Sequence, residues 1–170
     1  MSDTMRVPFV DKVVVNIGVG EAGDRLNKAQ KVLTMLTQQE PLVTTAKITN
    51  RDLGVRNGMP IGCKVTLRGE VAENFLRKAL SIRENRVAEY SFDPEGNLSF
   101  GISDYTDFEG MKYDPEIGIF GMDINVVIRR PGYRVSNRRI MPRKVPQQHR
   151  MTREEAMAFV RERFNVEVVE

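Results

Sequence analysis

The chain has 170 residues, of which 41% are hydrophobic, and its formal net charge is +3. This length and composition fit one domain with an appended tail and a hydrophobic core. A single cysteine, Cys63, excludes an intrachain disulfide, and the absence of a secretory signal or a long apolar run predicts a soluble cytoplasmic protein.

Hydrophobic periodicity predicts five strands and three helices. Alternating or β-branched residues predict strands at 12–17, 43–49, 63–67, 98–103 and 122–129. Apolar residues three and four apart predict helices at 24–38, 70–86 and 152–164. Thr152 and Glu155 have the spacing of a capping box. This order favours an α+β fold with a mainly antiparallel sheet, helices packed on one face and the other face open.

Acidic and basic residues are distributed unevenly along the chain. Residues 84–123 contain 2 Lys/Arg and 10 Asp/Glu, whereas residues 124–153 contain 9 Lys/Arg and no acid. We therefore expect surfaces with different partners. The predicted organisation is an α+β RNA-binding domain at 1–133, a basic extension at 134–151 that orders only against a partner, and a C-terminal helix at 152–170 that packs back on the domain.

The open face of the sheet is expected to be rich in hydrogen-bond donors. Strand alternation assigns to this face Lys12, Asn16, Lys64, Thr66, Arg68, Ser99, Asn125 and Arg129. Such a surface suits RNA phosphates and 2′-hydroxyls. The predicted rRNA-binding set also includes Lys47, Arg134, Arg138 and Arg139. The alternatives are a solvated sheet face and a solubilising basic tail.

A long loop at 50–62 is expected to project from this domain. It contains three glycines, a proline and the Asn57-Gly58 pair, which are typical of turns. Loops of this length in compact domains are usually functional or disordered. The glycines predict that the loop stays mobile until a ligand orders it, and Arg51 and Arg56 suggest a polyanionic ligand.

The segment Gly18–Gly23 matches the G-x-G-x-x-G pattern of dinucleotide-binding turns. Glu21 would bring negative charge close to a pyrophosphate, and no acid ends a following parallel strand. A tight strand-to-helix turn is the better interpretation, although a nucleotide-binding enzyme remains an alternative.

No catalytic or metal-binding constellation is predicted. His149 is the only histidine, so neither a zinc cluster nor a catalytic triad is plausible. The acidic residues between Asp104 and Glu116 do not have EF-hand spacing, which favours a solvated loop or a protein-docking surface. We expect no enzymatic activity and no cofactor.

Several longer blocks resemble a known family. These are residues 12–21, 67–69, 113–123 and 130–133, and they resemble large-subunit ribosomal protein five, with the archaeal branch suggested by the short N-terminus and basic C-terminal segment. The resemblance implies a ribosomal protein of the central protuberance that binds 5S rRNA and large-subunit rRNA beside other central-protuberance proteins. It also implies a loop near P-site tRNA and a bridge to small-subunit ribosomal protein thirteen.

Position in the chain would assign the tRNA contact to Arg51, Arg56 and Asn57, and the bridge to part of the acidic stretch. An RNA-binding regulator that acts off the ribosome is the remaining alternative.

Overall fold

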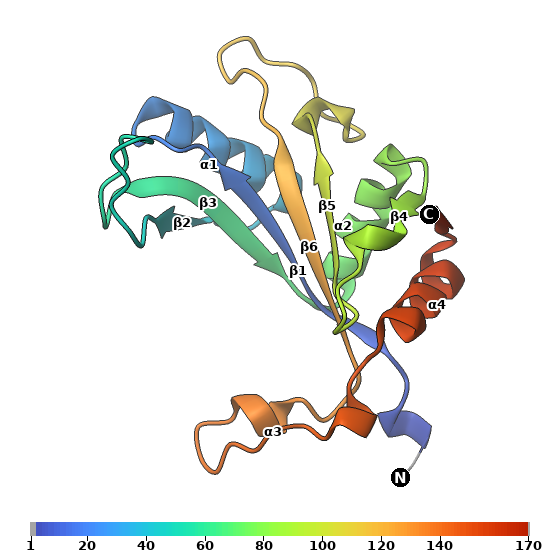
Figure 1. The fold of residues 1–170 in the computed structure, drawn as a ribbon. Coiled ribbons are helices and arrows are strands. Elements are labelled where there is room, and N and C mark those ends of the chain that lie inside the picture. The colour runs from blue at the N-terminus through green and yellow to red at the C-terminus, as the bar shows by residue number, and fades with distance from the viewer. Residues whose placement is uncertain (1–2, 170) are drawn as a thin grey trace. The chain divides into compact units, whose positions relative to one another are not determined.

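The computed structural model describes residues 3–169 and has the α+β fold expected from the sequence. In chain order its strands and α-helices are β1 (Phe9–Gly18), α1 (Asp24–Thr37), β2 (Leu42–Thr45), β3 (Pro60–Leu67), α2 (Gly69–Ile82), β4 (Arg86–Ala88), β5 (Leu98–Ile102), β6 (Met122–Arg129), α3 (Arg134–Asn137), α4 (Arg153–Phe164) and β7 (Glu167–Val169) (Figure 1). The predicted domain boundaries at residues 1 and 170 lie outside the described residues.

The main sheet has five strands in the order β2-β3-β1-β6-β5 and is mostly antiparallel. Strand β2 pairs antiparallel with β3, with Leu42 opposite Lys64 and Val43 opposite Cys63. Strand β6 has the predicted bounds, and its apolar side chains at every second position are buried. The mainly antiparallel sheet is thereby confirmed, whereas an open face that binds RNA remains a proposal.

Internal contacts divide the chain into two units, which we describe separately. The first unit contains the described part of Met1–Val13 together with Arg68–Phe100 and Asn125–Glu170. The second contains Val14–Leu67 and Gly101–Ile124. The division into a domain at 1–133, a basic extension at 134–151 and a C-terminal helix at 152–170 stays a prediction.

In the second unit, α1 lies along β3 and buries one apolar stripe (Figure 1). The stripe consists of Leu26, Ala29, Val32 and Leu33. The predicted acidic loop is also anchored in this unit, because Tyr105, Phe108 and Phe120 are buried. The exposed acidic residues of this loop are therefore attached to a backbone that buried aromatic side chains hold in place.

In the first unit, the predicted capping box of α4 is confirmed. The Thr152 hydroxyl accepts from the Glu155 backbone N–H, and the Glu155 carboxylate accepts from the Thr152 N–H. The predicted end of α2 at Arg86 is wrong, since the helix stops at Ile82 and Glu84 and Asn85 have left-handed backbone angles. The chain then enters β4, which pairs in parallel with β7.

The basic segment 134–151 has more internal structure than the sequence suggests. It contains α3 and a short turn of 3-10 helix at Gln147–His149. Val145 and Met151 are buried, and the Arg143 N–H donates to the Val135 carbonyl at 3.1 Å. The expectation that this segment orders only against a partner stays a prediction.

Candidate nucleic-acid interface

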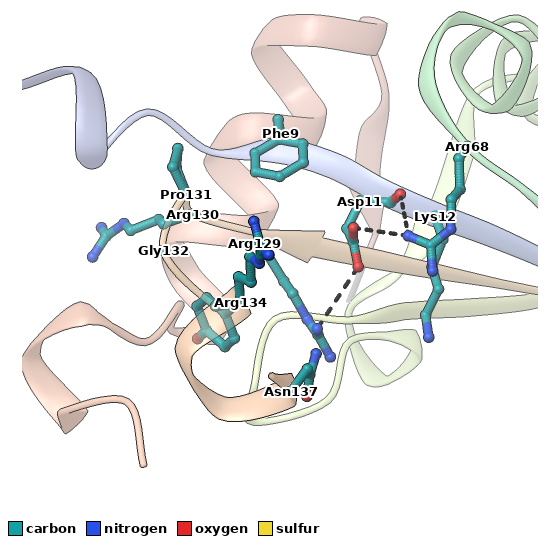
Figure 2. Close-up of a pocket in the computed structure, with 11 residues that line it drawn as sticks. Phe9, Asp11, Lys12, Arg68, Arg129, Arg130, Pro131, Gly132, Arg134 and Asn137 are labelled. Atoms are coloured by element: carbon teal, nitrogen blue, oxygen red, sulfur yellow. Dashed lines mark hydrogen bonds and ion pairs between the residues drawn. The ribbon is translucent and has the colours of Figure 1, made fainter. Parts of the chain in front are cut away.

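A basic cavity of about 390 Å³ lies in the first unit, where β1, the start of α2 and the end of β6 come together. Its charged lining consists of Asp11, Lys12, Arg68, Arg129, Arg130 and Arg134 (Figure 2). Phe9, Tyr133 and Asn137 add aromatic and amide groups. Among the described lining residues, Asp11 is the only acid, so the cavity is suited to an anion.

Asp11 contacts two of the arginines at once (Figure 2). Arg68 Nη1 donates to Asp11 Oδ1 at 3.1 Å and lies 3.4 Å from the Asp11 carbonyl oxygen. Arg129 Nη1 is 3.7 Å from Asp11 Oδ2. The carboxylate therefore joins β1 to the residue before α2 and to the last residue of β6.

The position of Asp11 depends on an irregularity in β1. Buried residues are two apart from Val13 to Ile17, but Val10 and Val13 are three apart. Asp11 and Lys12 are both half-buried and both line the cavity. Strict alternation would put them on opposite faces, and the strand predicted from the sequence begins only at Lys12, so Asp11 was not predicted.

The neighbouring residues Arg129 and Arg130 have different environments. The Arg129 guanidinium lies 5.1 Å from the centroid of the Tyr133 ring, a cation–π geometry that leaves the side chain 30% exposed. The Arg130 side chain is only 14% exposed, and its Nη2 donates to Glu155 Oε1 at 2.7 Å. Arg129 is thus available to a ligand, whereas Arg130 attaches α4 to the end of β6.

Other arginines in and beside the basic segment divide in the same way. Arg134, Arg138 and Arg139, all predicted to bind rRNA, are exposed, although Arg138 Nε also donates to the Met141 carbonyl. Arg150 donates to the Val145 carbonyl, and Arg153 donates to the Glu89 carbonyl at 2.6 Å. The last two side chains stabilise the chain itself.

The remaining predicted rRNA-binding residues occupy both units. In the first unit Ser99 is exposed and Asn125 is half-buried. In the second unit Lys47, Lys64 and Thr66 are exposed, and Asn16 is half-buried. The basic cavity gathers only Lys12, Arg68, Arg129 and Arg134 from the predicted set.

The loop at 50–62 contains internal hydrogen bonds, and its predicted mobility before ligand binding stays a prediction. Asn50 and Val55 exchange two backbone hydrogen bonds of 2.8 and 3.0 Å, and Val55 is buried. Arg51, Arg56 and Asn57, the predicted tRNA contacts, are exposed. The loop therefore presents these side chains from a closed turn.

Gly62, counted in the sequence analysis as a loop glycine, lies within β3. A Cβ atom there would be 2.8 Å from the Ile17 carbonyl oxygen. Its role is therefore to permit close strand approach.

Backbone N–H groups of the glycine turn at 18–23 are hydrogen-bonded to β3. The N–H groups of Val19 and Gly20 both donate to the Ile61 carbonyl, at 2.9 and 2.8 Å. Dinucleotide-binding turns need such N–H groups free to face phosphates. The strand-to-helix turn is therefore the better interpretation of this motif.

Cys63 is a core residue, and burial raises the pKa of its thiol to about 11 from an ordinary value of 9.0. Residues 3–169 contain no group of three or more His, Cys, Asp or Glu placed to hold a metal ion. No helix in that range is long and apolar enough to cross a bilayer.

Comparison with known proteins identifies the family. Residues 3–56 match the family model described as "Ribosomal protein L5", and residues 60–159 match the model of the C-terminus of the same ribosomal protein family. Large ribosomal subunit protein uL5 of Thermoplasma volcanium is 55% identical, over 97% of this chain and 98% of the relative. The uL5 protein of Picrophilus torridus is 53% identical over 98% and 96%, respectively. The chain belongs to the uL5 family of ribosomal proteins.

Membership of the uL5 family confirms a non-enzymatic protein of the large ribosomal subunit, and hence a component of cytoplasmic ribosomes. The uL5 protein of Methanosphaera stadtmanae is 48% identical over 98% of this chain and 99% of the relative. These relatives are archaeal-type proteins, as the resemblance implied.

Proposed function

We propose that this protein binds 5S rRNA and helps attach it to large-subunit rRNA in the central protuberance. The observation that carries the proposal is the basic cavity, in which Lys12, Arg68 and Arg129 converge from separate elements. Guanidinium groups donate in a planar fork that matches phosphate oxygens. Positions on strands and beside a helix are rigid enough to discriminate one RNA shape from another.

The second unit has exposed residues of its own that are proposed to contact RNA. Lys64 and Thr66 lie on β3, and Lys47 follows β2. Ammonium and hydroxyl groups suit the phosphates and 2′-hydroxyls that proteins read in structured RNA. The exposed arginines of the basic segment, Arg138 and Arg139, would add affinity with less selectivity.

The closed loop at 50–62 is proposed to contact P-site tRNA. Its buried Val55 and paired Asn50 support a fixed turn from which Arg51, Arg56 and Asn57 reach outward. Arginine contacts to phosphate and ribose do not depend on base identity. This property suits a site that must accept every tRNA.

The acidic loop is proposed to bridge to small-subunit ribosomal protein thirteen. Asp104 and Asp114 are engaged in capping the backbone N–H groups of Thr106 and Glu116. Asp107, Glu109 and Glu116 have exposed side chains that remain for a basic partner.

The experiment is to purify tagged protein from its own cell extract and sequence the RNA that remains bound. We expect 5S rRNA and large-subunit rRNA in the same particles as other central-protuberance proteins. Bound mRNA in light fractions would favour an RNA-binding regulator. Retention on immobilised NAD or ATP would favour a nucleotide-binding enzyme.

A second experiment separates the strands from the basic segment. Arg138→Gln with Arg139→Gln should weaken binding to all RNAs alike, and this pair avoids deleting the buried Val145. Asn16→Ala with Arg68→Ala should lower the preference for 5S rRNA. The reverse pattern would show that the basic segment selects the RNA.

A further inference from the structure

We infer that the basic cavity is a subsite for one RNA phosphodiester, in which Asp11 is a positioning residue that holds Arg68 and Arg129 ready to receive it. This inference rests on the proposed RNA-binding function. It assigns a favourable role to a carboxylate, a group that would ordinarily weaken the binding of a polyanion.

The contacts place Asp11 between two side chains that would otherwise be mobile. The side chains of Arg68 and Arg129 are 61% and 30% exposed, whereas that of Asp11 is 24% exposed. Arg68 is held at 3.1 Å from Oδ1 and Arg129 at 3.7 Å from Oδ2 (Figure 2). One carboxylate thus brings two like charges to the same wall of the cavity.

Most donors of the two arginines remain available to a ligand. A guanidinium has five N–H donors, and the contacts to Asp11 involve one terminal nitrogen of Arg68 and one of Arg129. Tyr133 stacks beside the Arg129 guanidinium at 5.1 Å and restricts it further. Arg130, which also lines the cavity, is engaged by Glu155 and has no part in this arrangement.

Two opposing effects of Asp11 on phosphate binding can be compared. Its charge repels a phosphate, but both would be near water, where Coulomb interactions are weak and screened by salt. Without Asp11, two rotamer-rich side chains must be ordered at the moment of binding, which is a larger cost. The benefit of holding the two arginines in place should therefore exceed the repulsion between Asp11 and the phosphate. Removal of the acid should then weaken RNA binding.

The test is Asp11→Asn, which keeps the shape of the side chain and removes its charge. Filter binding should show an affinity for 5S rRNA lower by about five- to tenfold, and an affinity for an unrelated structured RNA that also falls, because the phosphodiester is common to them. The matched control is Glu21→Gln, which removes one charge from the exposed pair with Arg25. The control should bind as tightly as the parent or slightly more tightly.

A double-mutant cycle tests whether Asp11 affects RNA affinity through Arg68 and Arg129. In a protein that already carries Arg68→Ala and Arg129→Ala, adding Asp11→Asn should change affinity by less than about twofold. Asp11→Glu, which retains the carboxylate, should recover part of the lost affinity. Binding is measured well below the melting temperature of each variant, so that a change in stability does not imitate a change in affinity.

Tighter or unchanged binding by Asp11→Asn would overturn the inference, because Asp11 would then act only as a repelling charge. The inference would also be overturned if Asp11→Asn lowered RNA affinity equally with and without the two arginines. The proposed preference for 5S rRNA is tested separately by the parent protein. A parent without that preference, combined with a weaker Asp11→Asn on both RNAs, would reject the preference and retain the phosphate subsite.

Discussion

Arg129 and Arg130 offer a test of the division between binding and structural side chains. They are adjacent and chemically identical, but Arg129 faces the basic cavity and Arg130 donates to Glu155 at 2.7 Å. We predict that Arg129→Ala weakens RNA binding with little change in stability. Arg130→Ala should lower stability and leave the salt dependence of RNA binding close to that of the parent.

The magnitudes follow from exposure and partners. The Arg130 side chain is 14% exposed and makes a charge-assisted hydrogen bond, so its loss should cost about 2 kcal/mol of unfolding free energy. Glu155 is 44% exposed and can regain water, which keeps the cost below that of breaking a fully buried pair. In a chain of this size, 2 kcal/mol corresponds to a fall in melting temperature of roughly 4–8 °C.

For Arg129 we expect the opposite pattern, with a small effect on stability and a larger effect on RNA affinity. Its contact to Asp11 is 3.7 Å and partly exposed, so removing it should cost at most about 1 kcal/mol of stability. Losing one phosphate contact should reduce RNA affinity by roughly tenfold and make the plot of log affinity against log salt shallower by about 0.7–0.9.

Thermal unfolding and filter binding across a salt series measure both quantities on the same preparations. The reasoning would be refuted if Arg130→Ala changed the salt slope while keeping its melting temperature and Arg129→Ala melted early with unchanged binding.

Three further predictions concern the loop and β3. Arg51→Ala with Arg56→Ala should leave 5S rRNA affinity unchanged and speed tRNA release from purified ribosomes, most clearly at higher salt; an unchanged release rate would show another role. Gly62→Ala should destabilise the protein by about 1–3 kcal/mol because its Cβ would meet backbone at 2.8 Å, whereas Gly18→Ala, with no atom within 4 Å, should stay within about 0.5 kcal/mol in thermal melts. Because burial raises the pKa of Cys63 to about 11, the unfolding free energy should fall as the pH rises from 9 towards 11, and a thiol reagent at pH 8 should react only as fast as the chain opens.

Elements specified by local patterns could be predicted from the sequence. Strand β6 coincides with the prediction because Met122, Ile124, Val126 and Ile128 alternate with less buried residues. The start of α4 was predictable because a capping box is formed by two residues three positions apart. Both signals are contained within a few residues.

Features that depend on distant segments were not predictable. Strands β4 and β7 are three residues each, and Arg86 pairs with Glu167 far along the chain. Periodicity cannot detect strands so short. The left-handed Asn85 was the available sign that α2 ends early, since asparagine tolerates that conformation.

The candidate site was predicted in part for the same reason. Alternation assigned Lys12 and Arg129 to one predicted face, and both line the basic cavity. Asp11 was missed because the predicted strand began at Lys12, whereas β1 begins at Phe9, and the spacing of buried residues is irregular between Val10 and Val13. The structural role of Arg130 depends on Glu155, which is 25 positions away in the chain.

This uL5-family chain is proposed to select 5S rRNA through fixed basic residues. The most direct measurement is competition filter binding of the parent protein to 5S rRNA against an unrelated structured RNA of equal length, from low to physiological salt. We predict tighter binding to 5S rRNA at every salt concentration and a steep, linear fall of log affinity with log salt. Equal affinity for the two RNAs throughout the series would contradict the claim.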